Sequence, residues 1–164
     1  MDKAIHGQST AHPDIAELLD NIGGAYNGLK DHRKSLSCLQ QSLEMSKRVY
    51  GPGIAHPKVA GTLSNIGYAW HSLGDLRQAM DYCEQALQMQ NTVFGETTAH
   101  DKTATYLNNL GVVCADLGDY KKALGYHQQS LQMLQTIYGT DTTHPRIAPR
   151  KQMVNMLRLM TVKL

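Results

Sequence analysis

The sequence predicts an all-α fold, a solenoid of antiparallel helix pairs, and two observations lead to this prediction. The first is an internal repeat with a period of 44 residues: His12-Pro13 returns as His56-Pro57 and as His144-Pro145, with His100-Asp101 between them. A fixed period of about 20–50 residues is typical of solenoids, whose units bury apolar surface by stacking. The second is a helical spacing of apolar residues within each unit. Solenoids usually serve as binding surfaces, so the repeat favours a binding protein over an enzyme.

The first helix of each unit is clearest in the third copy, where we expect it over residues 100–115. Apolar or small residues recur there at helical offsets, namely Tyr106, Leu107, Leu110, Gly111 and Cys114. Leu117-Gly118-Asp119 then ends the helix, because glycine supplies the positive φ of a tight turn. The proline that follows the leading histidine in other units suits a first helical turn, where its missing N–H costs nothing.

The second helix of the third unit is expected over residues 120–138. Asp119 can cap it through a side-chain oxygen, and Gly139 can end it. Its apolar side comprises Ala123, Leu124, Leu131, Leu134 and Ile137. The same elements recur in the other units at the 44-residue step, so each unit predicts one helix–turn–helix.

A glycine recurs inside the first helix of each unit, as Gly23, Gly67 and Gly111. Glycine in a helix interior costs roughly 1 kcal/mol against alanine. We therefore expect a close approach of the second helix at this point. The expected opposing residues are small ones twelve positions later, Ala79 and Ala123, with Ser35 in the first unit.

The C-terminal segment predicts one further helix, from Pro149 to about Lys163. Met153, Met156, Leu157, Met160 and Leu164 form a stripe at helical offsets, and Val154, Leu159 and Val162 lie off it. One interpretation is a closing helix that covers the last repeat, since terminal repeats need a cap. The other is a basic amphipathic helix for a membrane surface or a partner. The broad spread of apolar residues favours burial.

The repeat boundaries follow from the period. We expect repeats at residues 12–55, 56–99 and 100–143, and a partial repeat or capping helix at 144–164. Residues 1–11 are expected to be the end of a preceding repeat or a linker, because Ile5-His6-Gly7 matches Val49-Tyr50-Gly51.

Composition excludes several classes of function. The formal net charge is +2, so nucleic acid is not an expected partner. Five of the 16 basic residues and no acidic one lie in residues 144–164, an asymmetry that can mark an interaction tail. No run of about 18 apolar residues predicts a membrane span. Three cysteines without a CxxC pair favour free thiols and a cytoplasmic location. No nucleophile–base pair, phosphate loop or carboxylate pair predicts an enzyme or a cofactor site.

The repeat resembles the tetratricopeptide repeat (TPR). With Ala16, Ala60 and Ala104 as position 1, that family has Leu-Gly at positions 7–8, and this chain has Ile22-Gly23, Ile66-Gly67 and Leu110-Gly111. Position 11, an aromatic in the family, is Tyr26, Trp70 and Cys114, and the small residues of positions 20 and 27 are also present. The long unit, with Leu-Gly-Asp at the turn and His-Pro at the start, resembles the repeats of kinesin light chain and nephrocystin-type proteins.

The resemblance implies a right-handed superhelix whose concave wall, made by the first helices, binds an extended peptide or a partner protein. The peptide-binding residues that it implies are Asn21, Asn65, Asn109, Ser64, Tyr68, His71, Asn108 and Val112. An Asn amide can both donate and accept, so the ladder Asn21, Asn65 and Asn109 can pair with peptide units. Alternatively, these amides only hold neighbouring helices together. No Lys or Arg falls on the implied wall positions, so the carboxylate clamp of co-chaperone relatives is not expected.

Three further alternatives concern metal, assembly and context. His12, His56, His100 and His144 form a ladder, but equivalent residues of stacked repeats lie roughly 10 Å apart. One ion cannot bridge them, so we expect helix capping or packing rather than a metal site. A rival to the peptide-binding function is a self-associating module, with a possible homodimer through the solenoid ends. A second rival is a sensor arm of a larger signalling protein.

Overall fold

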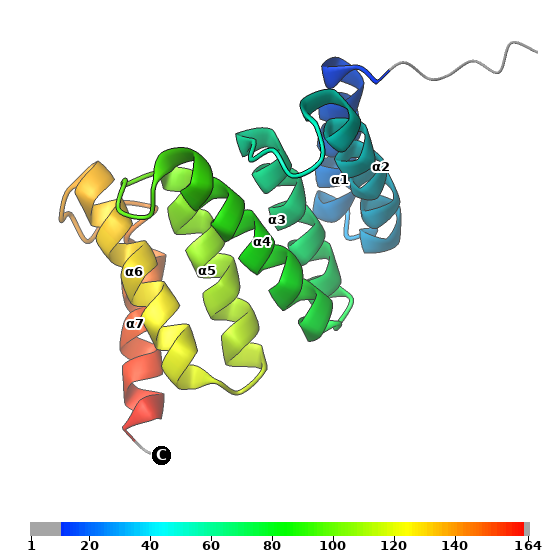
Figure 1. Cartoon of the computed structure of the whole chain (residues 1–164). Coiled ribbons are helices and arrows are strands. Elements are labelled where there is room, and N and C mark those ends of the chain that lie inside the picture. Colours follow the sequence, from blue (N-terminus) through cyan, green and yellow to red (C-terminus); the bar gives the residue numbers. More distant parts are fainter. Residues whose placement is uncertain (1–10, 163–164) are drawn as a thin grey trace, which may run out of the picture.

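The computed structural model describes residues 11–162, and in this range it contains seven helices and no strand. Three helix pairs follow one another along the chain: α1 (Pro13–Gly28) with α2 (His32–Tyr50), α3 (Pro57–Ser72) with α4 (Leu76–Phe94), and α5 (Asp101–Asp116) with α6 (Tyr120–Tyr138). A last helix, α7 (Ala148–Thr161), packs against α6. Figure 1 shows the pairs stacked side by side from the blue to the red end of the chain. The fold is an all-α solenoid, as the sequence predicts.

The walls of the solenoid follow from which helices touch. The odd-numbered helices α1, α3 and α5 contact one another directly, whereas each even-numbered helix contacts only odd-numbered ones. We call the two sides the odd-helix wall and the even-helix wall. Because helices converge on the odd-helix wall and separate on the other, the odd-helix wall is the inner curve.

The helix starts are fixed by the residues that the period repeats. The Nδ1 atoms of His12, His56 and His100 each accept a hydrogen bond from the backbone N–H two residues later, at 3.2 Å. His144 makes the same bond at 3.2 Å. Three of the four rings also pack on the aromatic residue that ends the preceding helix. His56 and His144 are stacked on Tyr50 and Tyr138, with centroids 3.7 Å apart for Tyr50 and His56, and His100 is tilted by 34° against Phe94. His12, His56 and His100 are therefore N-caps of α1, α3 and α5, whereas His144 makes the same bond within the turn that precedes α7, whose N-cap is Ile147.

The turns inside the pairs use the residue types that their geometry requires. Asp31, Asp75 and Asp119 cap the even-numbered helices, each accepting a bond from the N–H three residues later. Gly74 and Gly118 take φ of 86° and 83°, a region that favours glycine. Lys30 occupies the equivalent place in the first pair with φ of 61°. The first turn thus adopts the same shape without the glycine.

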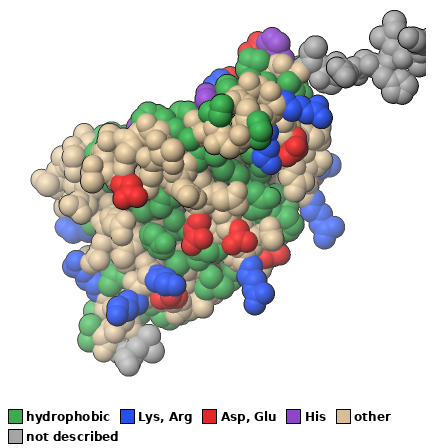
Figure 2. All heavy atoms as spheres, in the orientation of Figure 1, with side chains coloured by type: hydrophobic (Ala, Val, Ile, Leu, Met, Phe, Trp, Pro, Cys, Tyr) green, Lys and Arg blue, Asp and Glu red, His purple; other side chains and the backbone are tan. Residues whose placement is uncertain are grey.

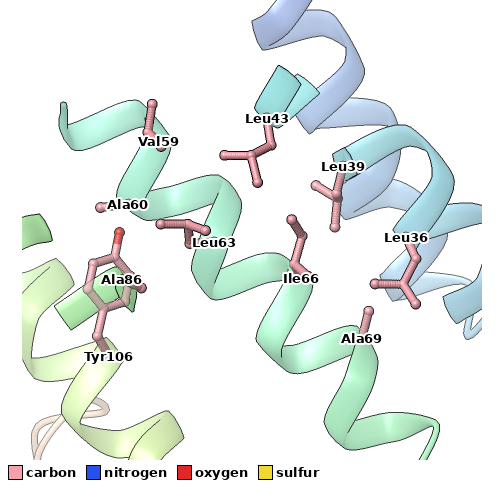
Figure 3. Packing of buried hydrophobic residues seen from close by; sticks show 10 residues of the cluster. All are labelled: Leu36, Leu39, Leu43, Val59, Ala60, Leu63, Ile66, Ala69, Ala86 and Tyr106. Carbon is pink, nitrogen blue, oxygen red and sulfur yellow. The ribbon is translucent and has the colours of Figure 1, made fainter. Parts of the chain in front are cut away.

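The core runs along the interface between successive pairs. Figure 3 shows Leu36, Leu39 and Leu43 of α2 facing Val59, Leu63, Ile66 and Ala69 of α3. Buried hydroxyls link the two helices of the first and third pairs: the Ser42 and Ser130 side chains donate to the carbonyl oxygens of Ala16 and Ala104 at 2.7 Å. Stacking therefore makes one core out of units too small to have their own.

The helical glycines lie where two helices approach closely, but the opposing residues differ from those expected. A Cβ on Gly23, Gly67 or Gly111 would come within 2.5–2.7 Å of a side-chain atom of Leu39, Cys83 or His127, respectively. These residues lie sixteen positions later, one turn beyond Ser35, Ala79 and Ala123. Of the three expected residues, Ser35 and Ala79 contribute only their carbonyl oxygens, at 3.3 Å. The prediction of a small side chain opposite was wrong, because the glycine itself makes the room that the larger side chain fills.

Helix α7 packs on α6 in the way that α3 packs on α2 and α5 packs on α4. Its buried side differs from the predicted apolar stripe. Val154 and Leu157 are 2% and 1% exposed against α6, whereas Met156 is 47% exposed. Val154 was expected off the stripe and Met156 on it. Val154 and Leu157 lie 44 residues after Leu110 and Val113, so the packing of the repeat decides which side is buried. The expected role of residues 1–10 and the stripe residue Leu164 lie outside the described residues.

The remaining expectations concern cysteines and the membrane. Cys83 and Cys114 are buried and Cys38 is half-buried, and burial raises the pKa of the Cys83 thiol to about 12. Among residues 11–162, no helix has the length and apolar character needed to cross a membrane.

Candidate functional site

The asparagine ladder lies on the odd-helix wall and partly links its helices. The Asn65 side-chain amide donates to Asp20 Oδ2 at 3.4 Å. The Asn109 amide donates to Ser64 Oγ at 3.1 Å. In both bonds the acceptor belongs to the preceding odd-numbered helix, one position before the equivalent Asn. Asn21 is exposed and its side chain makes no hydrogen bond with another described residue.

The ladder retains hydrogen-bonding capacity in spite of these links. An Asn amide offers two N–H donors and an acceptor oxygen. Asn65 uses one donor, and its Oδ1 has no protein partner within the described residues. Asn109 uses one donor, and its Oδ1 accepts from Asn108 at 3.4 Å. The geometry thus accommodates both interpretations of the ladder: the amides join helices and still carry groups that could meet a peptide.

Some of the other predicted site residues contact neighbouring side chains of the protein, and others are accessible to a ligand. Ser64 is buried and receives the bond from Asn109. His71 Nε2 lies 2.6 Å from Asp116 Oδ2 on the next odd-numbered helix. Tyr68 is 49% exposed, and its ring meets His32 edge-on with centroids 6.1 Å apart. Asn108 and Val112 are half-buried on α5. Tyr68 is therefore the most accessible of these side chains.

Asn27 of α1 supports the asparagine ladder through a hydrogen bond to α3 that was not predicted. It is 8% exposed, and its side chain donates to the carbonyl oxygen of Asn65 at 3.2 Å. His32 Nδ1 lies 3.2 Å from the Asn27 side-chain oxygen. The sequence places Asn27 on the wall, but only the approach of α1 to α3 shows that it is buried between them.

Basic side chains reach the wall from the first turns of α3 and α5 and from the turn before α7, which the sequence analysis did not predict. Lys58 of α3 pairs with Glu17 of α1, and Arg146 pairs with Asp101 of α5 at 2.7 Å and also contacts Thr105. Lys102 is the equivalent residue between them. The residue that could pair with Lys102 as Glu17 pairs with Lys58 is Gly61, which has no side chain. The recurrence of a base at residues 58, 102 and 146 was the signal in the sequence.

A cavity of about 210 Å³ opens on the wall beside Gly61 and is lined by Asp20, Asn21, Lys58 and Lys102, among others. Burial raises the pKa of the Asp20 carboxyl, an effect opposed by hydrogen bonds from Thr62 and Asn65 and by the charge of Lys102. Asp20 Oδ1 and the hydroxyl of Tyr106 are both buried without a hydrogen-bond partner in the described part of the chain. The cavity therefore combines lysine side chains and the Asp20 carboxyl group close to the asparagine ladder.

No group of three or more His, Cys, Asp or Glu side chains within residues 11–162 is arranged to hold a metal ion. In each histidine of the ladder, Nδ1 accepts a hydrogen bond from the backbone N–H two residues later.

The comparisons with known proteins concern this wall and the repeat that builds it. A family model described as tetratricopeptide repeat matches residues 14–92 and again residues 58–136. No curated protein matches the chain. Solved structures are similar to it: BtubC (BKLC) from P. vanneervenii has a TM-score of 0.74 and 21% identity over 91% of this chain and 56% of that one.

Two other solved structures show the same likeness. A Podosopora anserina protein described as a kinesin light chain with nearly identical TPR-like repeats has a TM-score of 0.74 and 14% identity, covering 89% of this chain and 66% of that one. The apo form of RapI has a TM-score of 0.77 and 12% identity, covering 95% and 53%. At these identities the likeness concerns the fold, and the chain spans only part of each neighbour. The matched repeats, found in register with the helix pairs, show that the chain belongs to the tetratricopeptide repeat family.

Proposed function

We propose that this protein is a non-catalytic interaction scaffold that binds an extended segment of a partner protein along its odd-helix wall. Tetratricopeptide repeats are protein–protein interaction modules. The observation that carries the proposal is the row Asn21, Asn65 and Asn109, whose amides keep free donors or acceptors on the inner curve. Successive odd-numbered helices lie roughly 10 Å apart, and an extended chain advances about 3.3 Å per residue. One amide therefore meets about every third peptide unit.

Backbone pairing gives affinity without sequence preference, so specificity has to come from neighbouring side chains. Tyr68 supplies an exposed ring. The cavity beside Gly61 offers Lys102 without the partner that Lys58 and Arg146 have. These features support the selection of one side chain of the bound segment between α1 and α5.

Replacement of Asn21 by Ala tests the proposal with the least structural disturbance. A peptide first has to be selected against the folded protein, for example by display. Because Asn21 has no partner among the described side chains, its loss is expected to leave the melting temperature unchanged. It should weaken the selected peptide by about 1–3 kcal/mol, which is roughly 5–150-fold, since a peptide group loses its partner.

Two further variants complete this titration. Asn65→Ala should weaken the peptide similarly and lower the melting temperature slightly, because the bond to Asp20 is also lost. Gln40→Ala, at an exposed position of α2 away from the odd-helix wall, is the matched control and should change neither. Unchanged affinity in both Asn variants, with a lower melting temperature for Asn65→Ala alone, would assign the ladder a structural role only.

A second candidate function, self-association through the ends of the solenoid, is favoured by exposed apolar side chains. On α1, Ile15 and Leu18 are 42% and 59% exposed. Leu159 of α7 is 68% exposed, and Val162, which follows that helix, is 86% exposed. Apolar surface of this kind promotes association. Sedimentation at about 100 μM, where contacts worth about 5.5 kcal/mol produce dimers, is expected to show a species larger than the monomer, reduced by Leu159→Lys. A strictly monomeric protein would exclude this function.

A further inference from the structure

The even-helix wall contains two equivalent furrows of different size. One lies between α2 and α4 and the other between α4 and α6, and in each the floor is an odd-numbered helix. The first holds a cavity of about 180 Å³ lined by Leu43, Leu63 and Met89, among others. The second holds a cavity of about 570 Å³ lined by the residues 44 positions later, Leu87, Leu107 and Met133. Because the two furrows are equivalent in the repeat, comparing them position by position shows which residue is present in one and absent from the other. Figure 1 shows α5 between α4 and α6, and Figure 2 shows the same face in space-filling form.

The loop before the odd-numbered helix accounts for the difference. In the first furrow the loop Gly51-Pro52-Gly53-Ile54 brings Ile54 to the cavity, where its side chain, 57% exposed, lies against Gly51. The loop of the second furrow reads Gly95-Glu96-Thr97-Thr98, so a threonine replaces the aliphatic residue. Thr98 does not line the larger cavity. An aliphatic cover that the chain supplies to the first furrow is therefore missing from the second.

The charged residues that line the second furrow are all acidic. A cavity of about 520 Å³ continues it along α4 and shares Leu87, Asn91 and Glu96 with the first part. The side-chain oxygen of Asn91 is buried and has no hydrogen-bond partner within the described residues. Glu84 and Glu96 are the charged residues of the lining, which includes no Lys or Arg. The furrow offers an apolar floor and negative charge.

We propose that the furrow between α4 and α6 is a second docking site, which takes an aliphatic side chain flanked by Lys or Arg in a segment of a partner protein. The aliphatic group occupies the place that Ile54 has in the equivalent furrow. The basic flank faces Glu84 and Glu96. The site lies on the wall opposite the asparagine ladder and does not depend on peptide binding there.

A capped tripeptide, acetyl-Lys-Ile-Arg-amide, is the probe for this site. A half-covered aliphatic residue and exposed charges give weak binding, in the roughly millimolar range, which amide NMR shifts follow well. The shifts are expected at Leu87, Asn91 and Met133 and not at Asn21 or Asn65. Acetyl-Lys-Ser-Arg-amide and acetyl-Glu-Ile-Glu-amide, which lack the anchor or the charge, should bind several-fold more weakly.

Two variants test the mechanism. Thr98→Ile restores the cover of the first furrow and should weaken the probe several-fold without unfolding the protein. Glu96→Gln removes one charge of the exposed rim and should weaken the probe in a salt-dependent way. The proposal is overturned by equal binding of the serine peptide, by unchanged binding in Thr98→Ile, or by shifts confined to the odd-helix wall. It is also overturned if the furrow signals depend on protein concentration without peptide, because a second copy of the chain would then be the occupant.

Discussion

Gly67→Ala is expected to lower the free energy of unfolding by about 2 kcal/mol, because overpacking costs about 1–3 kcal/mol and exceeds the helix-propensity gain of at most about 1 kcal/mol. The added Cβ would lie 2.7 Å from the Cys83 sulfur and 3.3 Å from the Ala79 carbonyl oxygen and the Cys83 backbone nitrogen. The backbone atoms cannot move without separating α3 from α4. For a chain of this size the loss corresponds to a melting temperature lower by roughly 4–8 °C.

Gly61→Ala is the matched control for this loss. Gly61 lies in the same helix, and the nearest atom to its added Cβ would be the Tyr106 hydroxyl oxygen at 3.8 Å, an ordinary contact. The propensity gain is then unopposed, and unfolding should become harder by up to about 1 kcal/mol. Circular dichroism during thermal and urea unfolding measures both. Equal effects of the two substitutions would show that helix packing at Gly67 is not limiting.

Acidification from pH 7 to pH 5 is expected to remove about 2 kcal/mol of stability through His127. This imidazole is 1% exposed. Burial, assisted by the positive charge of Arg150, lowers its pKa to about 4. Its unfolded value is near 6.5. The unfolded state therefore binds the proton more readily, so the contribution is complete above pH 6.5 and is lost as the pH falls towards 4.

His127→Leu isolates this effect, because Leu39 fills the equivalent place in the first helix pair opposite Gly23. The variant is expected to lose much less stability than the wild type between pH 7 and pH 5. Urea unfolding at several pH values gives the free energy of unfolding of both proteins as a function of pH. Parallel curves for the two proteins would mean that His127 is protonated as easily in the folded state as in the unfolded state.

The helix boundaries could be predicted because local interactions determine them. The expected helix over residues 120–138 is α6, and the one over 100–115 is α5, displaced by a single residue. His, Asp and Gly act within three residues of the helix end at which they stand, so the sequence contains the whole of that information. Because the sequence repeats every 44 residues, equivalent helix boundaries are expected in all three helix pairs.

The features that failed depend on contacts between helices. The side of α7 that is buried is decided by α6, so Met156 is exposed and Val154 is not. Which residue lies opposite each helical glycine depends on how far the two helices of the pair are shifted along their axes. The wall residues could be placed by their position in the repeat, but the link from Asn65 to Asp20 and the approach of Lys102 require the spacing of α1, α3 and α5. The larger furrow between α4 and α6 depends on the conformation of one loop.

The most direct test of the proposed function locates a bound peptide on the protein. A spin label attached to a peptide selected by display broadens NMR signals of nearby groups. The account predicts that the side-chain amide signals of Asn21, Asn65 and Asn109 broaden in sequence as the label is moved along the peptide in steps of about three residues. Broadening confined to the even-helix wall or to α7, with the three asparagine signals sharp, would contradict it.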